Sequence, residues 1–419
     1  MESGGVSMGL SRFFCVCAAL MLFTSSSVSA VEPPTMLSAL LNQHQQGTGV
    51  PDARFSNLEE ASLFYQRLNQ QAHWPRLAGG SLLRQDDRDT EITILRQQLM
   101  LLGDYRRLTQ ALIDEEYFDQ ELSEALKQFQ YRHGAKVDGI LGPKSRALLN
   151  VPPSQRLNQL SLNQYRVSQF RALALGRYIQ VNIPEFRLRL VDQGDTVLQL
   201  KTIVGRKKRK TPVFTTDIKA LVMNPSWTVP KSIGWKDIIP AWQADPEYLS
   251  RKNLSVAQGW GNQRVLLPSS EVEPQSMYNS DEYRYFWEAP GQGNTLGRIK
   301  FLSHSRYAIY LHDTSAPGLF NRDRRDLSSG CIRVERAEDL AQHLIQLDSP
   351  EQLPQLGSTL MTEKTSEIYL RHPVPVHMTY WTAWVDNQGL LNFRDDIYRR
   401  DEWEHSQLFA TSQLGSPKF

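Results

Sequence analysis

The sequence predicts an α+β chain of several domains, in which a small helical domain precedes a mainly-β, sandwich-like domain. Three observations support this prediction. The 419 residues exceed what one ordinary core holds. Apolar residues recur at helical spacing before residue 152. From residue 176 onward, apolar and polar side chains alternate over short stretches, as they do in half-buried strands.

The first thirty residues have the pattern of a secretory signal peptide. Arg12 precedes the apolar run 13–23, and small residues follow up to Ala30. Because a bilayer span needs roughly 20 apolar residues, we expect residues 1–30 to be removed by cleavage after Ala30. Cleavage would also remove Cys15 and Cys17 and leave an exported chain without stable membrane insertion. The alternative is an uncleaved membrane anchor.

Two helical regions are expected next. Residues 31–75 should form an N-terminal helical and linker region, and residues 76–152 a compact domain of three helices. The apolar positions that indicate these helices are Leu58, Ala61, Leu63, Phe64 and Leu68, then Ile92, Leu95, Leu99 and Leu102, then Leu122, Ala125, Leu126 and Phe129, and finally Ala147, Leu148 and Leu149. His133 lies before Gly134, where it is interpreted as the end of a helix and not as a metal ligand.

Residues 176–365 are expected to form the β domain, followed by a C-terminal extension over 366–419. The stretches that read as strands are 178–183, 186–191, 197–200, 202–204, 217–223 and 307–311. An insertion at about 228–290 interrupts them and is rich in tryptophan. A long insertion of this kind is typical of a lid over a binding cleft, and the alternative is a packed subdomain with its own aromatic core.

The charge pattern excludes one class of partner. Basic and acidic side chains nearly balance, at 47 against 45, so no nucleic acid partner is expected. The one basic run, 206–210, is interpreted as a solvated hairpin tip, with a binding patch for an acidic polymer as the alternative. Because the histidines lack a ligand spacing such as His-x-x-x-His, neither a metal nor another cofactor is expected.

Cys331 is the candidate nucleophile. It lies in Ser-Ser-Gly-Cys-Ile-Arg, downstream of His312. An unpaired cysteine in an exported protein is a candidate reactive thiol, and histidine is well suited to take its proton near neutral pH. Gly330 permits a tight turn, so that the amides of Gly330 and Cys331 can point at one developing oxyanion. The alternative is a buried, inert cysteine.

Two segments resemble known families. The pattern Phe-Gln-x-x-His-Gly-x-x-x-Asp-Gly-x-x-Gly-Pro over 129–143 resembles the peptidoglycan-binding module of bacterial wall enzymes. The order His312, a loop, then Ser-x-Gly-Cys resembles the catalytic motif of the L,D-transpeptidases, also called the YkuD type. The forms Tyr-Leu-His-Asp-Thr and Ser-Ser-Gly-Cys-Ile-Arg-Val resemble the large periplasmic branch of that family, which combines both modules with a lid insertion.

This resemblance implies a chemistry and roles for named residues. Cys331 would attack a diaminopimelate carbonyl in a peptidoglycan stem peptide, His312 would move the proton, and the Gly330 amide would bind the oxyanion. The residues expected to contact the substrate are Arg333, Ser329, Ser328, Tyr310 and Trp227. Most of the family has His at the position of Ser329 and Asn at that of Arg333. Which backbone carbonyl orients His312 is therefore left open.

The resemblance also leaves alternatives for the reaction. An amine acceptor would give a 3-3 cross-link in the periplasm, water would make the site an L,D-carboxypeptidase, and another amine would attach a wall protein. Carbapenems are expected to acylate the thiol. A cysteine peptidase of the NlpC/P60 type is disfavoured, because its cysteine precedes its histidine. A non-catalytic peptidoglycan-binding protein is the remaining alternative.

Overall fold

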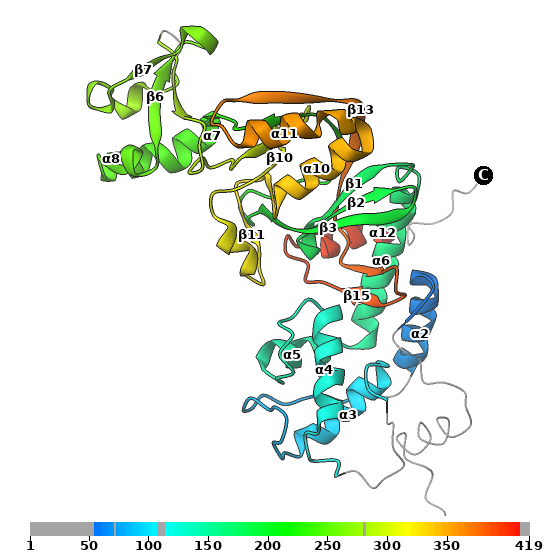
Figure 1. Cartoon of the computed structure of the whole chain (residues 1–419). Coiled ribbons are helices and arrows are strands. Elements are labelled where there is room, and N and C mark those ends of the chain that lie inside the picture. The colour runs from blue at the N-terminus through cyan, green and yellow to red at the C-terminus, as the bar shows by residue number, and fades with distance from the viewer. Residues whose placement is uncertain (1–53, 71–72, 107–113, 280–281, 411–419) are drawn as a thin grey trace, which may run out of the picture. The chain divides into compact units, whose positions relative to one another are not determined.

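The computed structural model describes residues 54–70, 73–106, 114–279 and 282–410 (Figure 1). The expected signal peptide, with Cys15 and Cys17, lies outside the described residues. None of the helices that the structure describes has both the length and the apolar character needed to cross a bilayer.

The expected helices are present, and a further long one follows them. The helices are α2 (Leu58–Gln70), α3 (Glu91–Leu101), α4 (Gln120–Arg132), α5 (Pro143–Leu149) and α6 (Pro153–Arg171). The Asp119 side chain caps α4 by accepting a hydrogen bond from the Leu122 amide. The sequence did not predict α6, because its apolar residues are few and do not form a regular stripe.

One continuous sheet forms the β domain. Its strands are β1 (Tyr178–Asn182), β2 (Arg187–Asp192), β3 (Asp195–Gly205), β4 (Phe214–Met223), β9 (Ile299–Ser303), β10 (Leu311–His312), β11 (Asp326–Ser328), β12 (Ile332–Val334) and β13 (Ser366–Thr379). Their order is β11-β3-β12-β10-β9-β4-β13-β1-β2, and β3 also pairs with β2. The sheet therefore closes on itself. The predicted α+β class is confirmed, and the sandwich-like part is a single closed sheet.

Three details differ from the sequence predictions. Residues 366–379 form β13, which pairs with β4 and β1 inside the sheet, so the β domain does not end at residue 365. Of the predicted strand 307–311, only Leu311 continues into β10. The run 206–210 follows β3, but β3 does not pair with β4, so this turn is not a hairpin tip.

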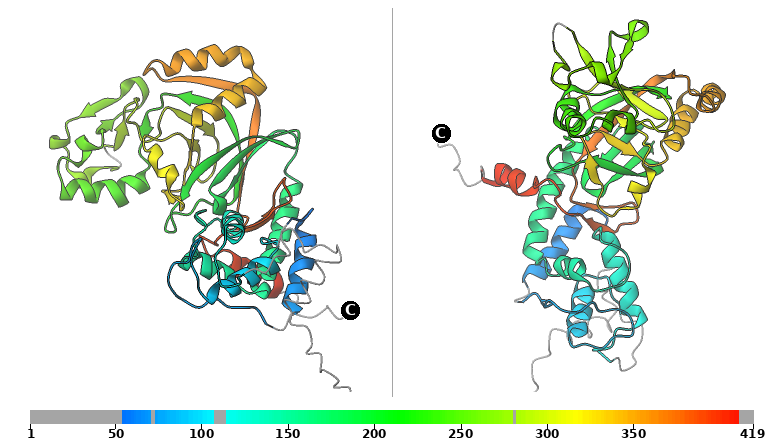
Figure 2. Two further views of the ribbon diagram at one scale, coloured as in Figure 1. Left: turned by 60° about the horizontal axis from the view of Figure 1, so that its bottom comes forward. Right: turned by 90° about the vertical axis from the view of Figure 1, so that its left-hand side faces the viewer.

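The interior of the closed sheet and two helices form the main core. The helices α10 (Ala337–Asp348) and α11 (Leu353–Leu360) lie beside the sheet (Figure 2). The apolar stripe of α10 packs into the cluster that the inward-facing strand residues form, and the stripe consists of Ala337, Leu340, Ala341, Leu344 and Ile345. This packing fixes the strands that carry the candidate site.

The insertion is a folded subdomain. It contains β5 (Trp227–Thr228), β6 (Leu254–Gln258), β7 (Val265–Leu267), β8 (Arg284–Glu288), α7 (Lys231–Ile233), α8 (Ile239–Ala244) and α9 (Tyr248–Arg251). The four strands form their own sheet in the order β5-β8-β6-β7. A separate core that includes Trp242, Tyr285 and Phe286 holds the subdomain together. The insertion is therefore a packed subdomain with its own aromatic core, the alternative given above.

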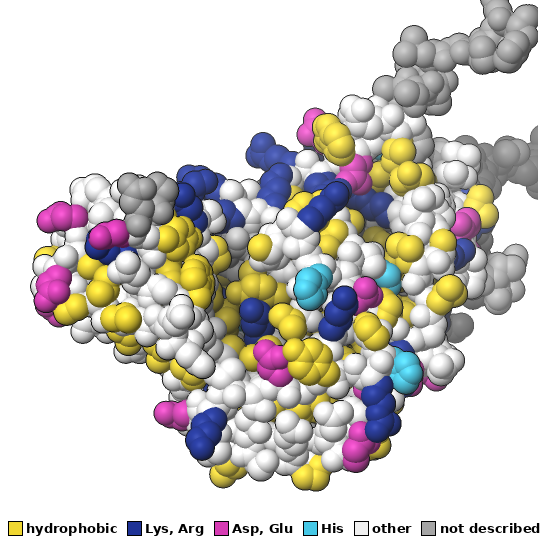
Figure 3. Space-filling view, turned by 90° about the horizontal axis from the view of Figure 1, so that it is seen from above, with side chains coloured by type: hydrophobic (Ala, Val, Ile, Leu, Met, Phe, Trp, Pro, Cys, Tyr) yellow, Lys and Arg dark blue, Asp and Glu magenta, His cyan; other side chains and the backbone are white. Residues whose placement is uncertain are grey.

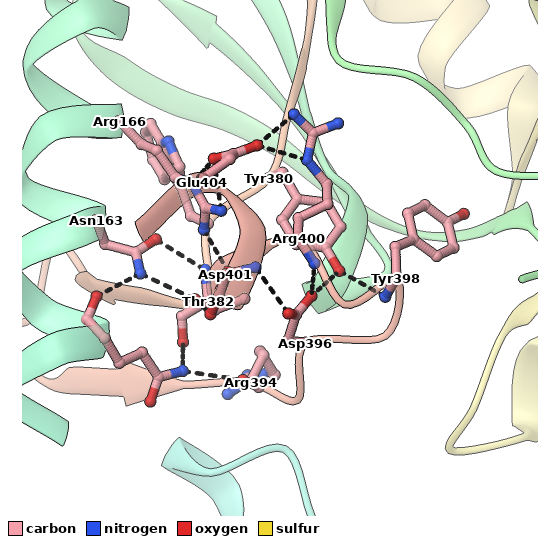
Figure 4. Close-up of polar contacts among 12 residues, drawn as sticks. Asn163, Arg166, Tyr380, Thr382, Arg394, Asp396, Tyr398, Arg400, Asp401 and Glu404 are labelled. Atoms are coloured by element: carbon pink, nitrogen blue, oxygen red, sulfur yellow. Dashed lines mark hydrogen bonds and ion pairs between the residues drawn. The ribbon is translucent and has the colours of Figure 1, made fainter. Parts of the chain in front are cut away.

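The segment after β13 packs against α6. It contains β14 (Ala383–Val385), β15 (Leu391–Phe393) and α12 (Asp401–Ala410). Asn163 in α6 accepts from the Thr382 amide at 2.9 Å and donates to its hydroxyl at 2.9 Å, and Arg166 forms an ion pair with Asp401 (Figure 4). Buried polar contacts of this kind attach the helix to the end of the sheet.

Candidate active site

Strand register places Cys331 and His312 on the same face of the sheet. The strands β10 and β12 are parallel, with Leu311 opposite Ile332 and His312 opposite Arg333. Leu311 and Ile332 are buried in the main core. Because side chains alternate along a strand, His312 and Arg333 point away from that core. Cys331 directly precedes β12, and its thiol interacts electrostatically with Arg333, which lies on that face.

His312 is held as a neutral ring. Its Nδ1 lies 2.6 Å from the carbonyl oxygen of Asp313, and a carbonyl only accepts hydrogen bonds, so Nδ1 carries the proton and Nε2 is the basic atom. Burial lowers the pKa of His312 to about 3, and the positive charge of Arg333 acts in the same direction. The sequence left open which carbonyl orients the imidazole. The Asp313 carbonyl contacts Nδ1, and a backbone hydrogen bond with Leu296 also acts on the ring and, like that of Asp313, opposes the fall of its pKa.

A glycine turn holds Asp313 in place. The Asp313 carboxylate accepts from the Arg298 amide at 2.8 Å. At Gly297, where φ is +65°, an added Cβ would lie 2.3 Å from the Asp313 carboxylate. Only glycine allows this approach. The turn at Gly297 therefore fixes Asp313, and the carbonyl of Asp313 in turn contacts the His312 ring.

Cys331 is a partly exposed, free thiol in this structure. Its Sγ lies 3.9 Å from the carbonyl oxygen of Ala308. Burial raises the pKa of the thiol, while the Tyr310 backbone and the charges of Lys300 and Arg333 oppose that rise. The resting pair therefore consists of a thiol and a neutral imidazole.

Hydrogen bonds within the Cys331 loop correct two expectations. The Ser328 hydroxyl is buried; it donates to the Cys331 carbonyl at 2.6 Å and accepts from the Gly330 amide at 3.0 Å. Gly330 thus has no free N–H for an oxyanion, and Ser328 shapes the loop and is not placed to contact a substrate. Gly330 has a φ of +124°, a backbone conformation that residues with a side chain rarely adopt, which explains why a glycine stands at this position. Among the described residues, the Cys331 amide has no acceptor.

Thr211 forms hydrogen bonds that connect this loop to β3. The Thr211 hydroxyl accepts from the Gly205 amide at 2.9 Å and donates to the Gly330 carbonyl at 2.7 Å. The Tyr398 hydroxyl donates to the Gly205 carbonyl. The loop is therefore connected to β3 and to the segment after β13. The sequence did not indicate that Thr211, which lies directly after the basic run, forms hydrogen bonds with this loop.

Arg209 links the loop to the insertion subdomain. Its guanidinium donates to the Ser329 hydroxyl at 3.0 Å and pairs with Asp237, which lies in the helical turn Gly234–Ile238. Arg206 reaches the same carboxylate at 3.5 Å. Ser329 was predicted to contact a substrate. In the structure it is exposed, and its hydroxyl accepts the hydrogen bond from Arg209. Two arginines of the basic run therefore form ion pairs with the insertion subdomain.

Tyr310, Trp227 and Lys300 form one wall beside the histidine. The rings of Tyr310 and His312 lie 5.7 Å apart, and Lys300 Nζ lies 4.4 Å from the centre of the Tyr310 ring. Burial raises the pKa of Tyr310, and a hydrogen bond with the Trp227 side chain opposes that rise. The structure therefore brings together Tyr310 and Trp227, two of the residues predicted to contact a substrate, and adds Lys300.

Arg333 is half-buried and unpaired. It forms no hydrogen bond or ion pair with any described residue, and its Nε is buried without a partner. A guanidinium in this state is suited to bind a carboxylate from a ligand. A space-filling view shows a hollow beside the insertion subdomain, lined largely by hydrophobic side chains, with basic side chains at its edge (Figure 3).

The described residues contain no group of three or more His, Cys, Asp or Glu side chains that could hold a metal ion.

Sequence reasoning missed Lys300 because β9 was not recognised as a strand. The signal was present, since Ile299 and Phe301 alternate with Lys300.

Comparisons with known proteins agree with the two resemblances. Residues 176–364 match the family model described as "L,D-transpeptidase catalytic domain", and residues 88–149 match "Putative peptidoglycan binding domain". A Haemophilus influenzae protein named "Putative L,D-transpeptidase" is 36% identical over 254 residues, which cover 60% of this chain and 50% of that protein. The chain thus spans about half the length of this curated relative.

Two solved structures are similar at 13% identity. They are the L,D-transpeptidase of Xylanimonas cellulosilytica (residues 123–326), covering 72% of this chain and 98% of its own, and that of Stackebrandtia nassauensis, covering 71% and 96%. Their TM-scores against this chain are 0.20 and 0.25.

Proposed function

We propose that this chain, which carries an L,D-transpeptidase catalytic domain and a peptidoglycan-binding domain, forms 3-3 cross-links between peptidoglycan stem peptides in the periplasm. The observation that supports this function is the parallel pairing of β10 with β12, which puts the free thiol of Cys331 on the face of the buried, neutral His312. A neutral imidazole and a thiol are the reactants that general-base activation of a nucleophile requires.

The first step is acylation of Cys331. As Sγ attacks the carbonyl at the L-centre of diaminopimelate in a tetrapeptide stem, its proton passes to Nε2 of His312. The C–N bond to the terminal D-alanine then breaks, and the imidazolium gives that proton to the leaving amine. The products are a thioester and free D-alanine. His312 starts neutral because burial lowers its pKa, and the negative charge that develops on Sγ as the proton leaves stabilises the imidazolium.

The Cys331 amide is the proposed oxyanion donor. It belongs to the nucleophile itself and has no acceptor among the described residues, whereas the Gly330 amide already donates to Ser328. A donor that points at the developing charge before the reaction begins needs no reorganisation, which is why such groups lower barriers. Tyr310, which lies beside His312, is the candidate for a second donor.

The second step transfers the acyl group. The side-chain amine of diaminopimelate in another stem attacks the thioester and gives its proton to His312, and the proton then returns to the departing thiolate. The new amide is the 3-3 cross-link. Water in place of the amine would give a tripeptide, and another amine would attach a different molecule. The acceptor therefore decides between transpeptidase and L,D-carboxypeptidase activity.

The two additional modules receive roles in this proposal. The peptidoglycan-binding domain would hold the glycan near the catalytic domain. The insertion subdomain would act as a lid over the thioester, since Trp227 contacts Tyr310 and Asp237 pairs with Arg209 beside Ser329. Exclusion of water by a closed lid would favour the amine.

Incubation of the protein with purified disaccharide-tetrapeptides tests the function. We expect mass spectrometry to find a dimer that lacks one D-alanine, together with released D-alanine. Tripeptide without dimer would indicate an L,D-carboxypeptidase. No change in the tetrapeptides, with no carbapenem adduct on Cys331, would reject acyl transfer and favour a non-catalytic binding protein.

A further inference from the structure

Lys300 lies on β9, the strand next to β10, which carries His312. It stands directly opposite His312 in the antiparallel pairing of β9 with β10. Its neighbours Ile299 and Phe301 are buried in the main core, so alternation turns Lys300 toward the face that carries His312. The position of Nζ over the Tyr310 ring agrees with this. The ammonium group therefore lies at the active site and not in open solvent.

No anion among the described residues neutralises Lys300. The nearest acid in the same row of the sheet is Glu367, since Lys300 pairs with Val222 and Val222 with Glu367. Glu367 instead accepts a hydrogen bond from the Tyr369 hydroxyl at 2.6 Å. Lys300 is half-buried, and this burial lowers the pKa of its ammonium group. An ammonium group partly removed from water and left without an anion is unfavourable unless a ligand supplies one.

Arg333 is the second unpaired cation of the site. It stands on the other side of His312, on β12, and its buried Nε has no partner. Other cations near the site are paired, as Arg209 is with Asp237 and Lys201 with Glu335. Lys300 and Arg333 are therefore two half-buried cations, each without an ionic partner among the described residues, on the face that carries Cys331.

The spacing of the two cations suits a ligand with two carboxylates. The strands β9 and β12 flank β10, so their backbones are separated by two strand spacings, roughly 10 Å. Arg333 is two residues from Cys331 on the same strand, and Lys300 lies across β10. Both cations act electrostatically on the Cys331 thiol, so both are within reach of a donor bound there. Arg333 lies on the strand that follows Cys331 and is assigned the carboxylate next to the bond that is attacked. Lys300 lies across β10 and is assigned the carboxylate at the end of a long side chain.

We propose that Lys300 binds the distal carboxylate of the diaminopimelate side chain of the donor stem, while Arg333 binds the carboxylate of the leaving D-alanine. This assignment rests on the proposed function. It makes Lys300 a specificity residue, which selects donors whose third residue has a free distal carboxylate over donors in which that group is amidated.

Binding to the Cys331→Ala variant tests the assignment without turnover. Calorimetry would compare two tetrapeptide donors that differ only in whether the distal carboxylate is free or amidated. A hydrogen bond between charged groups contributes about 1.5–3 kcal/mol, so Lys300→Met in this background should weaken binding of the free acid roughly tenfold to a hundredfold. Binding of the amidated donor should change less than about twofold.

Two further variants serve as controls. Lys219→Met removes an exposed lysine from the neighbouring strand β4 and should leave the affinity for both donors unchanged. Arg333→Met should weaken both donors equally, because both keep the D-alanine carboxylate. An equal loss for both donors in Lys300→Met would overturn the proposal and give Lys300 a general structural or thiol-stabilising role. Absence of any measurable donor binding to the Cys331→Ala variant would overturn it as well.

Release of D-alanine by the enzyme with Cys331 intact separates this inference from the function. If the free-acid donor binds through Lys300 but no D-alanine appears, the proposed function fails and the subsite stands. If D-alanine is released equally from both donors, in the presence and absence of Lys300, the function stands and the subsite fails.

Discussion

Two buried histidines, one in each matched domain, share most of the properties that are used to recognise catalytic residues. His133 and His312 are each 3% exposed. Each has Nδ1 hydrogen-bonded to a backbone carbonyl, that of Phe129 at 2.9 Å and that of Asp313 at 2.6 Å. Burial lowers the pKa of both rings, and nearby arginines act in the same direction.

Their surroundings separate them. The ring of His133 is stacked between Phe129, at 3.8 Å between centres, and Phe393, at 5.3 Å. His312 stands on the sheet face that carries Cys331, Tyr310 and the unpaired Arg333. A lowered pKa thus reports burial in both places. Only the second histidine lies on the face of a candidate nucleophile, and the predictions below use this contrast.

Loss of the nucleophile should have the largest effect. Because Cys331 is the only cysteine among the described residues, a carbapenem should add once per chain, and Cys331→Ala should abolish the adduct in an intact-mass measurement. The strained ring of a carbapenem serves here as the acyl donor. An adduct that persists in Cys331→Ala would place the nucleophile elsewhere and remove the distinction between the two histidines.

His312→Ala should slow acylation about a hundredfold or more, as the removal of a general base does. Stopped-flow measurement of carbapenem acylation would give the rate, and circular dichroism would show that the fold is retained. Acylation near the wild-type rate across neutral pH would direct the search to His304 or His343.

The pH dependence of acylation should reflect the lowered pKa of His312. A histidine with the ordinary pKa of about 6.5 would be mostly protonated at pH 5, and a rate that depends on it would fall about thirtyfold from the plateau. Burial, and then Arg333, lower the pKa of His312 to about 3, so its neutral fraction barely changes between pH 7 and pH 5. Single-turnover rates over this range would check this, and a decline with a midpoint near 6.5 would contradict it.

Removal of the insertion subdomain should change the product ratio more than the rate of acylation. Replacement of residues 229–289 by a short Gly-Ser linker should raise the ratio of tripeptide to dimer several-fold, because water then reaches the thioester. The closed sheet, whose strands lie outside the insertion, should still fold. An unchanged ratio in a folded variant would leave the insertion without a role in acyl transfer.

A milder change tests the link between the subdomain and the loop. Asp237→Asn weakens the pair with Arg209 and should raise the same ratio by about twofold, since exposed and half-exposed ion pairs contribute up to about 1 kcal/mol. Asp245→Asn is the matched control, because Asp245 lies in the same subdomain and pairs only with Arg251 there.

The smallest catalytic effect is expected for His133→Ala. Acylation by the folded protein should remain within about twofold of wild type, because His133 contacts no group of the candidate site. The free energy of unfolding should fall by about 2 kcal/mol, because the substitution leaves a cavity between two aromatic rings. A hundredfold loss of acylation at full stability would show that the aromatic stack acts on catalysis.

The sequence by itself determined the local features of this protein. Helical spacing predicted α2 to α5, alternation predicted the strands from β1 to β4, and the order of His312, Gly330 and Cys331 indicated the chemistry. These patterns depend on residues close together in the chain. Local periodicity and turn residues are sufficient to express them.

The tertiary structure alone decided which distant residues meet. It placed β13 between β4 and β1, directed the Gly330 amide to Ser328, and brought Lys300 to His312 through the pairing of β9 with β10. Strand register and loop hydrogen bonds join residues far apart in the sequence, and the energy that selects them comes from packing over the whole sheet. The sequence therefore predicted the candidate catalytic residues, while the fold decided which groups surround them.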